Sequence, residues 1–297
     1  RKFSADALAG VTVGIVALPL SMALAIASGL KPEIGLFTSV IAGTLVALFG
    51  GSRVQIGGPA GAFVPLLAPI VMRHGPQALV VCAFMAGVIL IVLGACKLGT
   101  LIKYIPYPVV MGFTSGIAII IMSTQIRDFF GLQDKLPPDF IGKLRAVAEN
   151  FHPNWPTVLL AVICTLAIWF WPKKIGRHVP GTIIIVILAG AASAIFDWPG
   201  KLGMQTLGTA FGEMPRSLPL PHWPALSFDE WRALVPAALT IAVLGSIESL
   251  LSAVVSDGMI DDRHDSNQEL KGQGIANIAM GIFGGMPATG VIARTAT

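Results

Sequence analysis

Two ionisable residues stand inside long uncharged stretches of this sequence, and they are its clearest chemical signals. Glu248 interrupts the apolar run 233–256, and Arg294 follows the apolar run 272–293. A charge at the centre of a bilayer costs about 2.5–3.5 kcal/mol, so such a residue is by default functional. A carboxylate in this position can hold a proton or a metal cation, and a guanidinium can hold an anion. Ser252 adds a hydroxyl one helical turn after Glu248, on the same face.

The sequence also contains two matching motifs that break helices. IGGPAG occupies positions 56–61 and GGMPATG occupies positions 284–290, each inside a long apolar stretch. Glycine and proline together interrupt a helix in the middle of a membrane. We therefore expect an extended stretch and then a half-helix at each motif, one beginning near Pro59 and the other near Gly290. Proline suits the first turn of a helix, because the N–H that it lacks has no partner there.

The two motifs are spaced as an internal repeat. Leu8, near the start of the first uncharged run, precedes Pro59 by 51 residues, and Leu234 precedes Pro287 by 53. Seven spans separate the motifs in order, and an odd number inverts the second copy. Paired interruptions of this kind indicate the binding site of a secondary transporter. Each half-helix would present free N–H groups and about half a positive charge, which favours an anion between them. Small residues at Ala60 and Gly61 would let that anion approach the backbone.

Membrane-spanning helices must position these motifs, and the composition is that of a membrane protein. Of the 297 residues, 54% are hydrophobic and 12% are charged, whereas soluble domains carry about 25% charged residues. A soluble domain, a disordered chain and a nucleic-acid-binding protein are therefore excluded. The apolar runs are continuous rather than alternating, which excludes a β-barrel. Stretches suited to crossing a bilayer as helices cover residues 7–30, 34–52, 54–72, 75–96, 104–126, 151–172, 179–196, 233–256 and 272–293.

Basic residues in the short loops indicate the orientation of the chain. If the N-terminus is cytoplasmic, the short outer loops hold only Lys31 and Arg73. The inner ones then hold Arg53, Lys97, Lys103, Lys173, Lys174 and Arg177. This excess on the inside follows the positive-inside rule. The sequence therefore predicts an integral protein of the cell (inner) membrane with a cytoplasmic N-terminus.

Several segments together resemble one family of anion transporters. They are VGIVALPLSMA at 13–23, GSRVQIGGP at 51–59, SNQELKGQGIANI at 266–278 and FGGMPATG at 283–290, followed by Arg294 and Thr295. The chain thereby resembles the SulP family, also called the solute-carrier-26 family. The resemblance implies an all-α polytopic fold of fourteen segments in two inverted repeats of seven, with half-helices at segments three and ten. It also implies a core domain that moves like an elevator against a gate domain.

The same resemblance implies a division of this chain. We expect residues 1–126 to hold the first-repeat core segments one to four and the start of the gate. Residues 127–232 would hold gate segments five to seven with outer loops, and residues 233–297 the second-repeat core segments eight to ten. Segments eleven to fourteen, and the cytoplasmic STAS domain that usually follows in the family, would lie beyond this sequence.

Residue roles follow from the resemblance position by position. The anion is expected at Gly58, Ala60, Gly61, Val291, Ile292, Ala293 and the basic residue Arg294. Glu248 matches the acidic position of segment eight. With Ser252 and Thr289 it would hold a coupling ion, either a proton or a sodium ion, the sodium lying at Glu248 and Ser252. No other cofactor is implied.

Two positions depart from the family pattern. Many members have glutamine after the proline of segment one and an aromatic residue four positions later. This chain has Leu20 and Leu24 there. The wall of the anion pocket is therefore expected to be more apolar and to lack a side-chain donor, which makes bicarbonate or a carboxylate as plausible a substrate as sulfate.

The function predicted from these observations is secondary active transport of a small anion, of the bicarbonate, C4-dicarboxylate or sulfate class. An elevator mechanism coupled to H⁺ or Na⁺ and a homodimer in the lipid bilayer are expected. Two alternatives stay open: a nucleobase permease of the same fold, and an uncoupled anion channel or motor-like protein. No catalytic motif is present, so an enzyme is not predicted.

Overall fold

The computed structural model describes residues 2–104, 107–132, 137, 140–172, 181–215, 217–224 and 227–295, which are mostly helical. The chain forms two compact units. One comprises Arg1–Leu18 and Ile119–Met214, and the other comprises Pro19–Ala118 and Pro215–Thr297. Helices α1 (Lys2–Ala27) and α5 (Tyr107–Phe130) contribute residues to both units. Every residue that the sequence predicts for the anion and cation sites belongs to the second unit.

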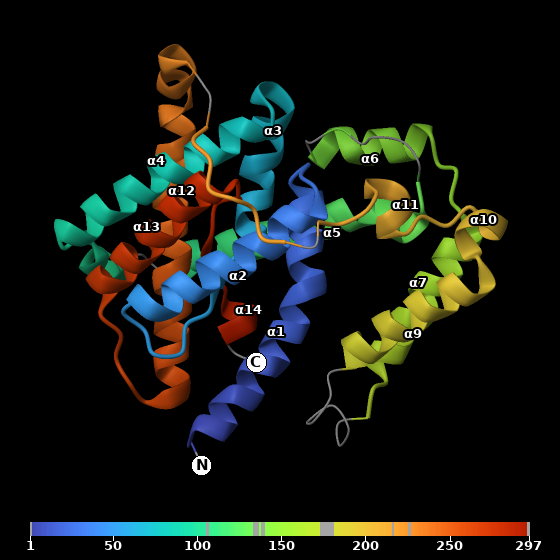
Figure 1. Cartoon of the computed structure of the whole chain (residues 1–297), viewed down its shortest axis with the longest axis horizontal. Helices are drawn as coiled ribbons and strands as arrows, with labels where there is room; N and C mark the ends of the chain where they lie inside the picture. Colours follow the sequence, from blue (N-terminus) through green and yellow to red (C-terminus); the bar gives the residue numbers. More distant parts are fainter. Residues whose placement is uncertain are drawn as a thin grey trace. The chain divides into compact units, whose positions relative to one another are not determined.

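The first unit contains a pair of short apolar helices, α7 (Trp155–Trp169) and α9 (Gly181–Phe196), which pack against each other (Figure 1). Asn154 caps α7 by accepting a hydrogen bond from the Thr157 N–H, and its Nδ2 donates to the Leu202 carbonyl at 3.0 Å. The unit also contains α6 (Phe140–Glu149), α10 (Trp198–Leu202) and α11 (Leu207–Phe211).

The second unit is built around α13 (Ser266–Phe283). This helix lies between α2 (Pro32–Phe49) and α4 (Pro76–Ala95), and the long helix α12 (Phe228–Ile260) crosses them (Figure 1). Among the residues that the structure describes, four helices are long and apolar enough to cross a membrane, namely α2, α4, α12 and residues 9–27 of α1. The core between them is apolar and includes Leu67 of α3 (Val64–His74), Val81 of α4 and Ile241 of α12.

Small residues bring α13 and α4 into close contact. A methyl group added to Gly87 of α4 would lie 2.6 Å from the carbonyl oxygen of Gly274 of α13, so neither helix can carry a larger side chain there. Helices in lipid gain little from hydrophobic burial and associate through such close backbone packing. The α2–α13–α4 layer is therefore a tightly packed frame for the segments that α2 and α13 lead into.

Both predicted helix breaks are present, and they lie side by side. Strand β1 (Gly57–Gly58) pairs antiparallel with β2 (Thr289–Gly290), with Gly57 opposite Gly290 and Gly58 opposite Thr289. A short 3-10 turn, η1 (Gly61–Phe63), leads from the first break into α3, and the second break leads into α14 (Ile292–Thr295). The paired half-helices predicted from the repeat are thus observed.

The position of Pro59 differs from the expectation. The helix after β1 begins at Gly61 rather than near Pro59, because Gly57 and Gly58 pair with β2 and Ala60 is extended as the residue that caps the turn. Pro65, not Pro59, is the proline of the first turn of α3. Pro19 lies within α1 without ending it.

Candidate functional site

Arg294 is held at the centre of the second unit. Its side chain is 2% exposed, although α14 is short. Nη2 donates to the hydroxyl of Ser21 on α1 at 2.8 Å, and Nη1 donates to the hydroxyl of Ser39 on α2 at 3.0 Å. The two hydroxyl oxygens lie 2.5 Å apart and bond to each other. Two helices of the first repeat thus accept hydrogen bonds from the arginine of the second.

The charge of Arg294 is not neutralised by the part of the chain that the structure describes. No carboxylate there forms an ion pair with it. Its Nε–H is buried and finds no acceptor among the described residues. A buried charge is costly unless an opposite charge balances it. The guanidinium therefore has both the unbalanced charge and the spare donor that an anion would use.

Gly58 of β1 lies against the same guanidinium. A methyl group added there would collide with Nη1 of Arg294 and would lie 3.2 Å from Cζ and 3.5 Å from the Ser39 oxygen. A side chain at this position would therefore displace the guanidinium from Ser39. Because Gly58 has no side chain, the guanidinium of Arg294 can stay at Ser39. The same space lets a ligand approach the backbone.

This contact gives a testable expectation. Gly58→Ala should push Arg294 away from Ser39 and weaken anion binding about tenfold, a loss of roughly one charge-assisted hydrogen bond. Gly258→Ala is the matched control, because nothing lies within 4 Å of the added methyl group. Binding measured by isothermal calorimetry on both purified variants tests the idea. Equal affinities for the two variants would mean that the arginine position does not matter for binding.

The other predicted anion-site residues surround the β1–β2 pair. Ala60 is 1% exposed and Val291 8% exposed, while Ile292 is 38% exposed and Gly61 is half-buried. Ala293 lies between Ile292 and Arg294 in α14. The breaks are joined by backbone bonds, since the Val291 N–H donates to the Ile56 carbonyl at 2.9 Å. The Ile56 N–H in turn donates to Thr295 Oγ1 at 3.2 Å. The structure thus brings the two half-helix starts together.

Leu20 and Leu24 lie on α1 beside Ser21, the residue that accepts from Arg294. Leu20 is half-buried and Leu24 is 6% exposed. Since residues one turn apart share a helix face, both leucines stand on the stretch of α1 that carries the arginine contact. That these leucines form the wall of the anion site stays a prediction.

Glu248 and Ser252 lie one turn apart on α12, and each has an unused polar atom. Glu248 Oε2 and Ser252 Oγ are buried and have no hydrogen-bond partner among the residues that the structure describes. Unpaired buried acceptors are rare in proteins and indicate a missing partner. Oxygen atoms of this type suit a proton or a hard cation such as sodium. These two oxygen atoms are therefore of the kind that the predicted coupling ion needs, and Glu248 and Ser252 would hold it.

Thr289 connects this turn of α12 to the breaks. Its hydroxyl donates to the Gly245 carbonyl at 3.0 Å and lies 2.6 Å from Ser249 Oγ. Ser249 Oγ also accepts from the Gly290 N–H at 3.0 Å. The hydroxyl of Thr289 is thus occupied by α12, and strand β2 is fixed to the turn that carries Glu248.

Three polar side chains in a row on α13 position both breaks. This role was not predicted from the sequence. Glu269, Gln273 and Asn277 are buried at a spacing of four residues, with exposures of 0–1%. At one end Glu269 accepts from the Gly51 and Ser52 N–H groups at 2.8 and 3.2 Å. Gln273 donates to Glu269, and Asn277 Nδ2 donates to the Gln273 carbonyl.

At its other end the row fixes the second break. Asn277 exchanges two hydrogen bonds with the backbone of Ala288, at 2.8 and 2.9 Å. The row therefore holds the segment before β1 and the segment before β2 from one helix. The three residues recur every four positions within the motif at 266–278, which places them on one helix face.

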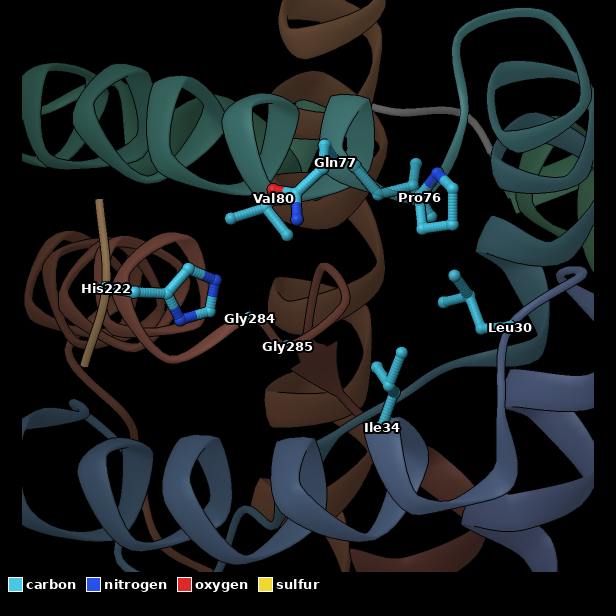
Figure 2. Close-up of a pocket in the computed structure, with 9 residues that line it drawn as sticks. Leu30, Ile34, Pro76, Gln77, Val80, His222, Gly284 and Gly285 are labelled. Carbon is cyan, nitrogen blue, oxygen red and sulfur yellow. The ribbon is translucent and has the colours of Figure 1, made fainter. Parts of the chain in front are cut away.

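A pocket of about 160 Å³ lies elsewhere in the second unit (Figure 2). The side chains of His222 and Gln77 point into it, beside Gly284 and Gly285 and opposite Leu30 and Ile34 (Figure 2). None of the predicted anion-site or cation-site residues lines it. This pocket is therefore separate from the site built around Arg294.

A helical membrane fold in which two opposed helix breaks pair beside a buried arginine is typical of secondary transporters. The comparisons with known proteins agree. The chain matches the Sulfate permease family over residues 3–297, and it belongs to this family, which confirms the resemblance to SulP transporters. Its relatives are transporters and not enzymes.

Two relatives are informative. The chain is 46% identical to the "Putative sulfate transporter YvdB" of Bacillus subtilis, covering 100% of this chain and 56% of that protein. It is 32% identical to the "Bicarbonate transporter BicA" of a Picosynechococcus species, covering 99% of this chain and 53% of that protein. The chain thus spans about half the length of these relatives.

Solved structures confirm the fold. The transmembrane domain of a cyanobacterial bicarbonate transporter BicA superimposes with a TM-score of 0.88 at 32% identity, covering 100% of this chain and 76% of that one. The murine Solute Carrier 26 family member A9 anion transporter superimposes with a TM-score of 0.85 at 20% identity, covering 97% and 52%. The predicted all-α, 7+7 inverted-repeat fold is therefore confirmed, and the chain is part of an integral membrane protein.

Proposed function

We propose that the protein containing this chain carries a small anion across the membrane, with the anion bound beside Arg294 at the paired breaks. The observation that supports this most directly is the buried guanidinium itself, which lacks a carboxylate partner among the described residues and has a spare Nε–H. An anion would supply the missing charge and the missing acceptor. The names of the relatives, sulfate and bicarbonate transporters, point to the same class of substrate.

An elevator motion coupled to a cation is the mechanism that we propose. The division of the chain into two compact units supports it, since every proposed ligand of the anion and the cation lies in one of them. Glu248 and Ser252 would bind the coupling ion, H⁺ or Na⁺. We further propose a cytoplasmic N-terminus in the inner membrane, which the basic residues of the short inner loops support, and a homodimer, as the resemblance to the family implies.

The substrate that we favour is bicarbonate or a carboxylate rather than sulfate. Leu20 and Leu24 would leave the α1 side of the site without a side-chain donor, and sulfate has more acceptor oxygens around one centre than a carboxylate group or bicarbonate has. Uptake by the full-length protein in proteoliposomes tests the proposal, with radiolabelled sulfate, bicarbonate, succinate, fumarate and uracil. Each is tested with and without a sodium or pH gradient. Uptake of uracil alone would identify a nucleobase permease, and gradient-independent anion flux would identify a channel.

The apolar wall gives a prediction about selectivity. Leu20→Gln should improve competition by sulfate relative to succinate by about fivefold, because one added donor is worth about 1 kcal/mol. The inhibition profile of succinate or bicarbonate uptake measures the change. Leu18→Gln introduces the same change at a side chain of the same helix that is 50% exposed. If both variants keep the wild-type profile, Leu20 does not face the anion.

A further inference from the structure

A third buried oxygen without a partner among the described residues belongs to a side chain that contacts α12, the helix of Glu248 and Ser252. It is Oε1 of Gln55, whose side chain is 4% exposed and which stands in the segment before β1. Among the described residues nothing donates to this oxygen. The sequence motifs give Gln55 no role, and it comes from the first repeat whereas Glu248 and Ser252 come from the second.

The contacts of Gln55 place its amide at the turn of α12 that carries the other two oxygens. Gln55 Nε2 donates to the Ser249 carbonyl at 3.1 Å. In an α-helix a carbonyl points toward the residues one turn later, so the amide stands level with Ser252. Residues 249 and 252 lie about 60° apart around the helix, and 248 and 252 about 40° apart. Ser252 therefore lies between Gln55 and Glu248 on one face.

The three oxygens are not hydrogen-bonded to one another. Glu248 Oε2, Ser252 Oγ and Gln55 Oε1 each lack a partner among the described residues. Unpaired buried acceptors are unfavourable. One monovalent cation would give these oxygens a partner. A proton on Glu248 Oε2 would supply a donor, and a sodium ion would take the oxygens as ligands.

We infer that Gln55 is the third ligand of the coupling cation and the residue that joins this cation to the anion site. This inference rests on the proposed function and adds a ligand from the opposite repeat. The joining contact is Gly290, because a methyl group there would collide with Gln55 Nε2 and lie 2.7 Å from Cδ. Gly290 is the β2 residue next to Val291 of the proposed anion site. Cation binding that orders the Gln55 amide would therefore also order β2 and raise the affinity for the anion. By thermodynamic reciprocity, anion binding would raise the affinity for the cation by the same factor.

Few other charges face this turn. Of the elements that pack against α12, α4, β2 and η1 carry no charged residue. The remaining ones carry Lys103 in η2 (Leu98–Tyr104), Glu269 and Lys271 in the first turns of α13, and Arg294 in α14. Glu269 is already bonded to Gly51, Ser52 and Gln273. Glu248 is therefore the carboxylate that can respond to a cation here.

Gln55→Met tests the inference, because methionine keeps the length and removes both amide atoms. In proteoliposomes of the full-length protein, this variant should need at least tenfold more cation for half-maximal driven uptake. The anion concentration for half-maximal exchange, measured without a gradient, should change less than twofold. Sodium is varied at fixed pH and pH at fixed sodium, which identifies the ion. Gln77→Met is the control for the loss of an amide, because Gln77 lines the separate pocket, which contains none of the proposed anion-site or cation-site residues; its cation requirement should equal the wild type.

The outcomes separate this inference from the proposed function. No anion uptake by the wild type under any gradient overturns the proposed function and the inference with it. Driven uptake by Gln55→Met with an unchanged cation requirement overturns the inference alone. If Gln55→Met does not fold, Gln55→Asn keeps the amide but withdraws it by one methylene group. A cation requirement of Gln55→Asn equal to the wild type would then overturn the inference, and an increase of several-fold would support it.

Discussion

Arg294→Ala is expected to lower anion affinity by at least about 30-fold, the largest effect on binding that the structure predicts. Removing one partner of a buried charge pair costs about 2–5 kcal/mol, and 2 kcal/mol corresponds to about 30-fold in affinity. The loss should be greater for a divalent anion than for a monovalent one, because the Coulomb energy grows with the charge of the ligand. Titration of the variant with sulfate and with a monocarboxylate measures both effects.

The same variant should remain folded. Ser21 and Ser39 already bond to each other, so neither hydroxyl is left unpaired when the guanidinium is removed. A buried charge without a counter-ion is also removed, which favours the folded state in the absence of anion. We therefore expect a melting temperature at or above that of the wild type, and no further rise on adding anion, whereas the wild type should be stabilised by its ligand.

Arg294→Lys provides the control for charge. Lysine keeps a positive charge but has a single ammonium group that cannot reach both hydroxyls in the planar geometry of a guanidinium. It should retain more of the affinity than alanine does and lose specificity between anions. Anion stabilisation of the alanine variant equal to that of the wild type would show that the anion binds elsewhere.

The helix breaks and the buried arginine could be predicted from the sequence because each is a local signal. Glycine and proline interrupt a helix wherever they occur together, and a charge in an apolar run is visible without a structure. The partners of Arg294 could not be predicted in this way. Ser21 and Ser39 lie 273 and 255 residues away in the chain, and serines are common within apolar helices. Only the packing of α1 and α2 around α14 distinguishes these two.

The start of the first half-helix was misplaced for a related reason. Proline at a first turn is a sound local rule, and Pro59 satisfies it. Pairing of β1 with β2, which brings together residues 233 positions apart at Gly57 and Gly290, keeps Pro59 and Ala60 extended instead. A tertiary contact here overrides a local preference. The local rule then applies to Pro65, six residues later, where no strand pairing competes.

The buried row on α13 could have been found from the sequence. Glu269, Gln273 and Asn277 recur every four residues in the sequence, which places them on one helix face. Their partners are mostly backbone groups of Gly51, Ser52 and Ala288. Backbone partners carry no sequence signature, so the face could be predicted but its function of fixing both breaks could not.

The row and the α12 contacts together explain how two sites can communicate without touching. Asn277 fixes the segment before β2, and Ser249 fixes β2 itself through the Gly290 N–H. The proposed anion site is thus attached to the helix that carries Glu248. A change in the protonation or cation occupancy of that helix would alter contacts of β2, which is how the proposed function would couple the two ions.

Glu248→Gln is expected to abolish concentrative uptake while leaving exchange of substrate. Glutamine has the same size and fills the same space, but it cannot take up a proton and offers a neutral ligand to a cation. Without a bound driving ion, the gradient of that ion does no work on the anion. The anion should therefore reach only its equilibrium distribution, so that the whole concentration ratio built up by the gradient is lost. Counterflow of labelled anion should continue, because Arg294 and the breaks are intact.

Two variants of α12 control for this result. Glu248→Asp keeps a titratable carboxylate and should retain driven uptake at a reduced rate. Glu230→Gln changes an acid in the first turn of the same helix, where Glu230 forms a capping box with Ser227; glutamine serves equally at that position of a capping box, so coupling should be unchanged. Accumulation is measured in proteoliposomes as the ratio of internal to external labelled anion under an imposed pH or sodium gradient. If Glu248→Gln still accumulates anion with the wild-type dependence on pH and sodium, Glu248 is a packing residue and the driving ion binds elsewhere.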